Sequence, residues 1–163
     1  MSRYRLLLII SAIILVLDQA TKLYIDHRFA LYESVTVIEN FFNITYIRNK
    51  GAAFGILSDS AIRIPFFITV ATVAAVGILW YLRHVRADQR LLHWALSLVF
   101  AGAVGNLIDR IRLGEVIDFL DVHWYQYHWP AFNVADSAIC VGVGLMLLDL
   151  WFEERQKQAH AKN

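Results

Sequence analysis

The sequence has little charge, one cysteine and two prolines. Only 18% of its residues are charged and the formal net charge is +1, so the chain lacks the basic excess of a typical nucleic-acid-binding protein. The single cysteine, Cys140, excludes a disulfide framework and a metal site made of cysteines within the chain. Apolar side chains, in contrast, make up 58% of the residues, and the mean hydropathy is +0.50. This composition predicts an integral membrane protein.

Four apolar segments are long enough to cross a membrane as helices, and they cover residues 6–25, 64–82, 91–111 and 134–152. The second is uncharged from Ile64 to Leu82 and would form a helix about 28 Å long at 1.5 Å per residue. No small-residue cleavage site follows the first segment, so we interpret it as a retained membrane helix. The sequence therefore predicts one mainly α-helical, multi-pass membrane domain over residues 1–163.

The basic residues predict the orientation of these helices. Lys and Arg are absent from the connection 113–133, whereas eight of them lie near the two ends of the chain and between the second and third segments, on one side of a four-span arrangement. Because basic residues favour the cytoplasmic side, we expect both termini in the cytoplasm. Residues 26–63, where apolar and polar residues alternate as in two or three short strands, are then expected to form a platform outside the cytoplasm with the loop 113–133. A turn near Gly51 would lead into a short surface helix.

Polar residues interrupt the apolar segments in one half of the membrane. Counted from the cytoplasmic ends, Asp18, Asn106, Arg110 and Asp136 lie roughly 18 to 28 Å deep in a hydrocarbon core of about 30 Å. Asp18 and Lys22 are four residues apart, so they share one face of a helix, as do Asn106 and Arg110. Such faces are expected to point into the bundle, where polar groups find partners.

Some of these residues fit a structural role. Asp18 with Lys22, and Asp109 with Arg110 or Arg112, are expected to form ion pairs, because a charged group inside a bundle needs a partner. The sequence therefore predicts structural roles for Asp18, Lys22 and Asp109.

Other polar residues leave two interpretations open. Asn49 and Asn106 fit equally well as partners of backbone groups and as members of a site. His123 and His128 are a weak metal signal without a third ligand nearby, and Asp121 fits a solvated loop charge.

Asp118 and Asp136 are different, because neither has a Lys or Arg within four positions of the sequence. Two carboxyl groups that share a site cannot both ionise easily, so one of them takes up a proton. Such a pair can act as general acid and general base around a trapped water molecule. The spacing in the sequence alone does not show that the two side chains meet.

Five blocks of the sequence together resemble the bacterial lipoprotein signal peptidases (signal peptidase II). They are residues 18–22, 43–55, 102–110, 116–119 and 132–137, in this order and over nearly the whole chain. The resemblance implies four transmembrane helices with a small extracytoplasmic β-cradle and a short surface helix. It also implies an aspartic endopeptidase that removes the signal peptide from prolipoproteins by cleaving before a diacylglyceryl-modified cysteine.

The resemblance assigns residues as well. Asp118 and Asp136 match the catalytic aspartates, and polar residues that line the site are matched by Asn49, Asn106, Arg110 and Asn133. We expect these four residues to bind substrate together with Gly51 and Phe54. We expect no cofactor or metal, a monomer in the bacterial cytoplasmic (inner) membrane, and an active site near its outer face. The expected partners are diacylglyceryl-modified prolipoproteins and membrane lipid, with no nucleic acid.

Three other classes of protein remain as alternatives. A proton- or ion-coupled transporter subunit would also hold Asp and Arg inside a bundle, but over its full depth. A scaffold protein would have no use for two carboxylates without basic partners. A metal-dependent phosphoesterase could use Asp118, Asp121 and Asp136 as ligands.

Overall fold

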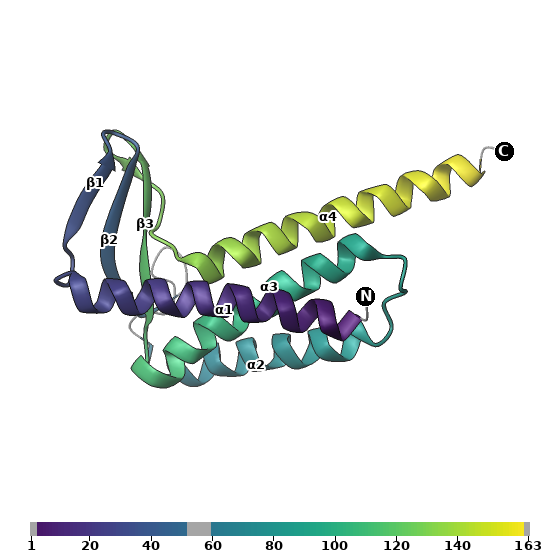
Figure 1. Cartoon of the computed structure of the whole chain (residues 1–163), viewed down its shortest axis with the longest axis horizontal. Coiled ribbons are helices and arrows are strands. Elements are labelled where there is room, and N and C mark those ends of the chain that lie inside the picture. Colours follow the sequence, from purple (N-terminus) through teal and green to yellow (C-terminus); the bar gives the residue numbers. More distant parts are fainter. Residues whose placement is uncertain (1–2, 52–59, 162–163) are drawn as a thin grey trace.

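The computed structural model describes residues 3–51 and 60–161, and these form four helices and a small antiparallel sheet (Figure 1). The helices are α1 (Arg3–Arg28), α2 (Arg63–Leu82), α3 (Arg90–Leu113) and α4 (Val134–Ala161). All four are long and apolar enough to span a membrane, which confirms the predicted class of mainly helical integral membrane protein. The short surface helix expected after Gly51 lies outside the described residues.

Helix α4 continues past residue 152, where the apolar segment was expected to end, and projects beyond the other helices (Figure 1). Its last part, from Glu153 onward, is rich in charged and polar residues that favour helix but have low hydropathy. Hydropathy marks the stretch that fits in lipid, not the end of the helix.

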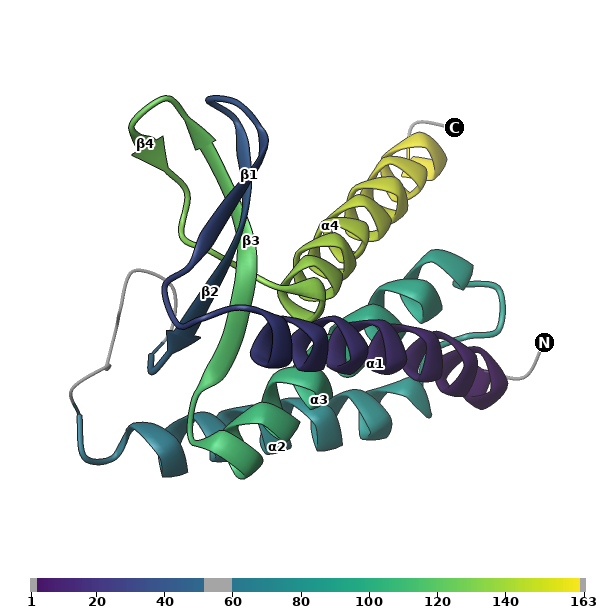
Figure 2. The same cartoon turned by 60° about the vertical axis from the view of Figure 1, so that its left-hand side comes forward.

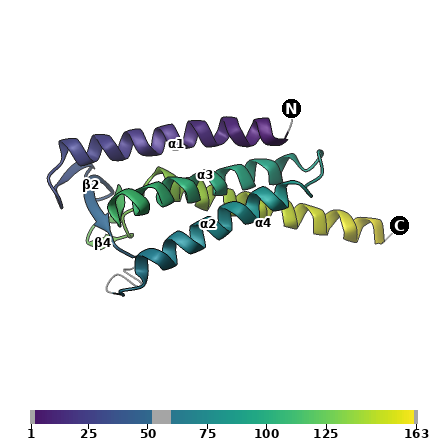
Figure 3. The same ribbon diagram turned by 90° about the horizontal axis from the view of Figure 1, so that it is seen from below.

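Helix α3 is the centre of the bundle and packs against each of the other three helices (Figure 3). Half of its most apolar window is buried in the protein, whereas none of the corresponding window of α2 is, so much of the surface of α2 is left to face lipid. Glycines allow α3 and α4 to approach closely. A Cβ atom on Gly142 would lie 2.8 Å from the carbonyl oxygen of Ala95, and one on Gly102 would lie 2.3 Å from that of Ala135.

The sheet lies across one end of the bundle, beside the start of α4 (Figure 2). Its strands β1 (Ser34–Ile38), β2 (Phe42–Asn49), β3 (Val116–Trp124) and β4 (Tyr127–His128) follow one another in antiparallel order. The expectation that residues 113–133 are a loop was therefore wrong. Val116 to Phe119 are all buried, so β3 starts without the apolar–polar alternation by which a half-buried strand is recognised.

A β-bulge in β2 decides which residues of β2 and β3 share a face. Ile44 pairs with Leu120 and Ile47 pairs with Asp118, so β2 has one more residue than β3 between these two pairs. Opposed residues of an antiparallel pair point to the same side, and side chains alternate along a strand. The extra residue therefore moves Asn49 to the same face of the sheet as Asp118.

The turn from α3 into β3 is made by Gly114. Its φ of 71° lies in the left-handed region, and its N–H donates to the carbonyl oxygen of Arg110 at 3.1 Å. This is the usual way for a glycine to end a helix. The turn sends the chain back across the end of the bundle, which brings Asp118 over α3.

Close packing of α3 and α4 predicts unequal effects of two similar substitutions. Gly142→Ala would place a methyl group against Val99 and the backbone of Ala95, whereas Gly144→Ala meets nothing within 4 Å. We expect Gly142→Ala to cost about 1–3 kcal/mol of stability and Gly144→Ala to cost less than about 0.5 kcal/mol. Thermal unfolding of the two purified variants in detergent micelles measures this. Equal melting temperatures would contradict close packing at Gly142.

Candidate active site

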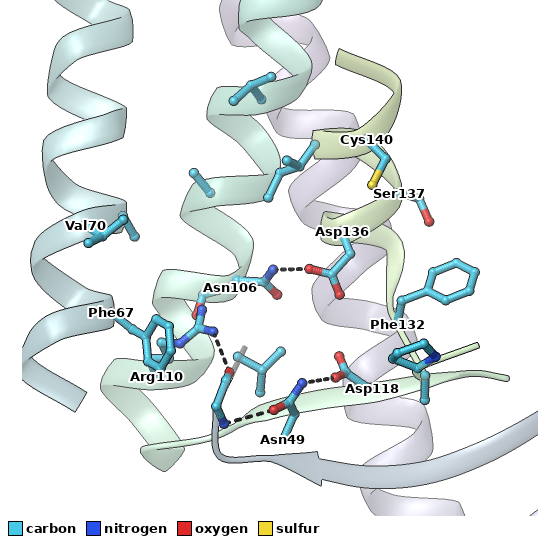
Figure 4. A pocket seen from close by; sticks show the side chains of 18 of the residues that line it. Asn49, Phe67, Val70, Asn106, Arg110, Asp118, Phe132, Asp136, Ser137 and Cys140 are labelled. Atoms are coloured by element: carbon cyan, nitrogen blue, oxygen red, sulfur yellow. Dashed lines mark hydrogen bonds between the residues drawn. The ribbon is translucent and has the colours of Figure 1, made fainter. Parts of the chain in front are cut away.

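Asp118 on β3 and Asp136 in the first turn of α4 line the same cavity, where the bundle meets the sheet (Figure 4). The cavity has a volume of about 760 Å³. Asp118 is buried and Asp136 is half-buried. The fold thus brings together two carboxyl groups that are 18 positions apart in the sequence. We call them the aspartate pair.

Asn133 contacts both members of the aspartate pair. Its Oδ1 accepts a hydrogen bond from the N–H of Asp136 at 2.9 Å, and Oδ2 of Asp136 accepts one from the N–H of Asn133 at 3.2 Å. This reciprocal arrangement is a capping box at the start of α4. The Nδ2 atom of Asn133 also donates to Oδ1 of Asp118 at 2.7 Å. One fully buried asparagine therefore fixes the place of both carboxylates.

Asn49 and Asn106 also turn their amide nitrogens toward the aspartate pair (Figure 4). Oδ1 of Asn49 accepts a hydrogen bond from the N–H of Gly51 at 2.9 Å, which leaves its Nδ2 to donate to Oδ2 of Asp118 at 2.8 Å. Nδ2 of Asn106 donates to Oδ1 of Asp136 at 2.7 Å. Of the two interpretations open for these asparagines, membership of a site fits Asn106, and Asn49 serves both a site and the backbone.

Asp118 lies in an environment that opposes its ionisation. Burial, followed by the charge of Asp136, raises the pKa of Asp118 from 3.8 to about 7, although hydrogen bonds from Asn49 and Asn133 act in the opposite direction. A carboxyl group of this kind exchanges a proton near neutral pH, which is the property a general acid or base needs.

Arg110 lines the cavity from α3. Its Cζ lies 4.7 Å from the centre of the Phe67 ring, and its guanidinium donates to the carbonyl oxygens of Gly51 at 3.4 Å and Asn106 at 3.5 Å. These contacts hold the guanidinium at the rim of the cavity, within reach of a bound molecule. Gly51 also lines the cavity, whereas Phe54, expected to bind substrate, lies outside the described residues.

Beneath the aspartate pair lies a buried cluster of Lys22, Asp18 and Asp109, which we call the lysine cluster. Nζ of Lys22 lies 2.9 Å from Oδ2 of Asp18 and 3.0 Å from Oδ2 of Asp109. The side chains of all three residues are at most 2% exposed. The pairing of Asp18 with Lys22 is the one expected from their spacing.

The expected pairing of Asp109 with Arg110 or Arg112 is wrong. Successive residues of a helix point about 100° apart, so Asp109 faces α1 while Arg110 faces the cavity. Gln19 completes the contacts of the lysine cluster, since its Nε2 donates to Oδ1 of Asp109 at 3.1 Å. Sequence reasoning missed Gln19, although it lies between two residues of a motif that was recognised.

Asp121 is buried, so the interpretation as a solvated loop charge is also wrong. It accepts a hydrogen bond from Nδ2 of Asn43 at 2.9 Å, and Nδ1 of His128 lies 2.8 Å from it. Three positions beyond Asp118 on the same strand, it points away from the cavity. Among residues 3–51 and 60–161, no three His, Cys, Asp or Glu side chains are grouped so that they could hold a metal ion.

The remainder of the cavity is apolar and extends along the membrane helices. Its walls consist mainly of small and branched side chains from three helices, which are Val70, Ala71 and Ala74 of α2, Val99 and Ala103 of α3, and Ile139 and Val141 of α4. Sequence reasoning did not single out these residues, because apolar side chains that line a cavity do not differ in type from those that meet lipid.

Fold and cavity together define a class, that of multi-pass membrane proteins with two carboxyl groups in a largely apolar cavity at one end of the helix bundle. The model of the family Signal peptidase (SPase) II matches residues 10–152. The chain belongs to the signal peptidase II family, and it is therefore a peptidase.

Individual relatives agree with this assignment. The chain is 55% identical over 159 residues to the lipoprotein signal peptidase of Syntrophotalea carbinolica, which covers 98% of this chain and 99% of that protein. It is 62% identical over 143 residues to that of Geobacter sulfurreducens, with 88% and 89% covered. A bacterial membrane enzyme solved by the in meso method at 2.3 Å resolution is 35% identical and superposes with a TM-score of 0.82, over 93% of this chain and 90% of that one.

The raised pKa of Asp118 predicts how pH changes stability. The folded protein binds this proton more tightly than the unfolded chain, so the contribution of Asp118 to stability is fully present below about pH 4 and is lost as pH rises through about 7. Asn does not ionise. We expect the free energy of unfolding of Asp118→Asn, relative to that of wild type, to increase as the pH is raised from about 5 to about 8, by at most about 4 kcal/mol. Thermal unfolding at both pH values measures this, and a difference that does not change with pH would contradict the raised pKa.

Proposed function

We propose that this peptidase is an aspartic endopeptidase of the bacterial cytoplasmic membrane, and that it removes the signal peptide from prolipoproteins by cleaving before a diacylglyceryl-modified cysteine. The observation that carries the proposal is the aspartate pair, two carboxyl groups in one cavity whose oxygen atoms are held by three asparagine amides. Membership of the signal peptidase II family and similarity to lipoprotein signal peptidases support prolipoproteins as the substrates.

In the proposed reaction, the aspartate pair holds one proton and a water molecule lies between the two carboxyl groups. Asp136 removes a proton from the water, whose oxygen attacks the scissile carbonyl carbon, while Asp118 gives its proton to the carbonyl oxygen. The tetrahedral intermediate then collapses: Asp136 returns the proton to the nitrogen of the cysteine, the C–N bond breaks, and one hydroxyl of the intermediate gives its proton back to Asp118 as the C=O bond forms again. The raised pKa of Asp118 supports its role as the proton donor near neutral pH.

The three asparagines and Arg110 have supporting roles in this scheme. Nδ2 atoms of Asn49 and Asn133 donate to the two oxygens of Asp118, which holds the carboxyl plane still while its proton moves. Arg110, stacked on Phe67, offers a planar donor fork to a backbone carbonyl or glyceryl ester oxygen of the substrate.

The proposed orientation places the aspartate pair near the outer face of the membrane. Both ends of the chain lie at the end of the bundle away from the sheet, and so does the α2–α3 connection, which contains Arg83 and Arg86 and leads into Arg90 at the start of α3 (Figure 1). Basic residues mark the cytoplasmic side. The sheet and the cavity then lie at the outer side, where a lipidated signal peptide would present its cleavage site.

Position in the membrane explains why a lipidated substrate would be preferred. The substrate already lies in lipid, so its acyl chains gain no further transfer from water when they enter the apolar part of the cavity. Two acyl chains instead fix the modified cysteine at the depth of the headgroup boundary. This presents the preceding amide to the trapped water in a near-attack geometry.

The arrangement of the polar residues disfavours the alternatives. A phosphoesterase that used Asp118, Asp121 and Asp136 as ligands would need the three carboxylates together, whereas Asp121 points away from the cavity. A transporter would need polar groups along the whole path, whereas the lining of this cavity becomes apolar beyond the aspartate pair.

Removing either carboxylate tests the chemistry. We expect Asp118→Asn and Asp136→Asn each to lower kcat by at least about 10⁴-fold, because the acid and base roles are lost, and to leave a folded protein. The assay follows cleavage of a diacylglyceryl-modified prolipoprotein in detergent micelles, with folding checked by thermal unfolding. Turnover by either variant near the wild-type rate would refute the assignment of the aspartate pair.

Two controls belong to this experiment. Cys140→Ala is expected to leave the rate unchanged, because the proposed reaction uses no thiol. A chelator is likewise expected to have no effect, and inhibition that is reversed by adding a divalent metal would favour a metal-dependent hydrolase.

Substrate choice has a separate test. We expect the same prolipoprotein without the diacylglyceryl group to be cleaved at least about 100-fold more slowly in the same membrane, because its cleavage site is no longer held at one depth. The comparison uses lipidated and unlipidated forms of one substrate in vesicles of one composition. Equal rates would leave an aspartic peptidase without preference for lipid.

A further inference from the structure

The lysine cluster contacts the backbone immediately before each member of the aspartate pair. Oδ1 of Asp18 accepts a hydrogen bond at 2.9 Å from the N–H of Ala135, the residue before the pair's member on α4. Oδ2 of Asp109 accepts one at 3.2 Å from the N–H of Ile117, the residue before the member on β3. Asp18 and Asp109, which neutralise Lys22, therefore also hold α4 and β3, the two elements that carry the aspartate pair.

Lys22 itself decides how the amide of Asn106 is turned. Its Nζ donates to Oδ1 of Asn106 at 3.0 Å, and Nδ2 of Asn133 donates to the same oxygen at 3.2 Å. Because two donors face this oxygen, the Nδ2 atom of Asn106 is left for Asp136. If the amide were turned over, its NH₂ group would face an ammonium group and its oxygen would face a carboxylate, which is repulsive on both sides.

We propose that Lys22 is a positioning residue of the peptidase reaction, which fixes the amide of Asn106 and, through Asp18 and Asp109, the backbone on which the aspartate pair stands. This rests on the proposed function of the pair and adds to it a residue that does not touch the substrate. The role proposed for Lys22 differs from the purely structural role predicted from the sequence. A buried ion pair by itself adds little to the stability of a fold, so stability alone does not explain the lysine cluster.

The decisive variant removes the ammonium group without changing the charge of the lysine cluster. Lys22→Met/Asp109→Asn keeps one carboxylate, so the formal charge stays at −1 as with one lysine and two aspartates. Its new asparagine still offers an oxygen to the N–H of Ile117. The reference is Asp109→Asn, which retains the lysine and its bond to Asn106.

We expect the double variant to have a kcat at least about 100-fold below that of Asp109→Asn, per molecule of folded enzyme, because a misplaced catalytic group costs about this much. KM is expected to stay within about twofold of that of Asp109→Asn, and the pH of maximal rate is expected to match that of wild type, because the double variant keeps the wild-type charge of the cluster. The assay measures cleavage of the lipidated prolipoprotein from about pH 5 to pH 9.

A matched control separates positioning from loss of stability. Leu96 packs with Leu7, Leu82 and other apolar residues in a core at the end of the bundle away from the aspartate pair. Leu96→Ala is expected to lower the melting temperature, because it opens a cavity, and to keep kcat per folded molecule. A double variant that behaves like Leu96→Ala has lost stability alone, which would overturn the proposal.

The remaining outcomes are equally decisive. Recovery of the double variant's rate at another pH would show that Lys22 acts through its charge and not through orientation. Lys22→Met/Asp18→Asn keeps the same formal charge and replaces the first variant if that one does not fold. Failure of both to fold, with Leu96→Ala folded, would make Lys22 a folding residue and overturn the proposal. Activity of Asp118→Asn would instead refute the aspartate pair itself.

Discussion

A lysine buried among helices must be surrounded by carboxylates, because an uncompensated charge inside a protein in a membrane is too costly to keep. In this chain the ammonium group of Lys22 draws Asp18 of α1 and Asp109 of α3 to one point. Each of these carboxylates also accepts a backbone N–H group, Asp18 at the start of α4 through its other oxygen and Asp109 at the start of β3 through the same oxygen that faces Lys22. One electrostatic requirement thus brings two helices together and joins the sheet and α4 to them.

The position of the aspartate pair depends on the lysine cluster. Its two carboxyl groups would repel each other if both were charged, and they are held together by asparagines that offer donors to them. Each asparagine is turned the right way because a different group occupies its oxygen. The reactivity proposed for the aspartate pair therefore depends on hydrogen bonds that the pair does not make itself, those to the oxygens of the three asparagine amides.

The helices, and the two aspartates as candidate site residues, could be predicted from the sequence for physical reasons, whereas the meeting of the two aspartates could not. An uncharged run such as Ile64 to Leu82 has few stable locations besides a membrane, and a carboxylate such as Asp118 without a basic neighbour needs an explanation. The position of Asn49 next to Asp118 could not be predicted from the sequence. It faces Asp118 because of one extra residue in β2, and neither Thr45 nor Tyr46 marks a bulge by its type. The partner of Asp109 was missed for a similar reason, since neighbours in sequence were favoured over a residue 87 positions away.

The cavity opens sideways, between α2 and α4. Its lining residues Val70 and Val141 are 50% and 55% exposed, on helix surfaces that meet lipid. A substrate whose apolar segment lies in the same membrane would reach the site by lateral diffusion. Encounters are then governed by the number of substrate molecules per lipid or detergent molecule and not by their number per litre. Empty micelles or vesicles that exchange their contents with the enzyme's own would slow the reaction by surface dilution, whereas a larger volume of water would leave its rate unchanged.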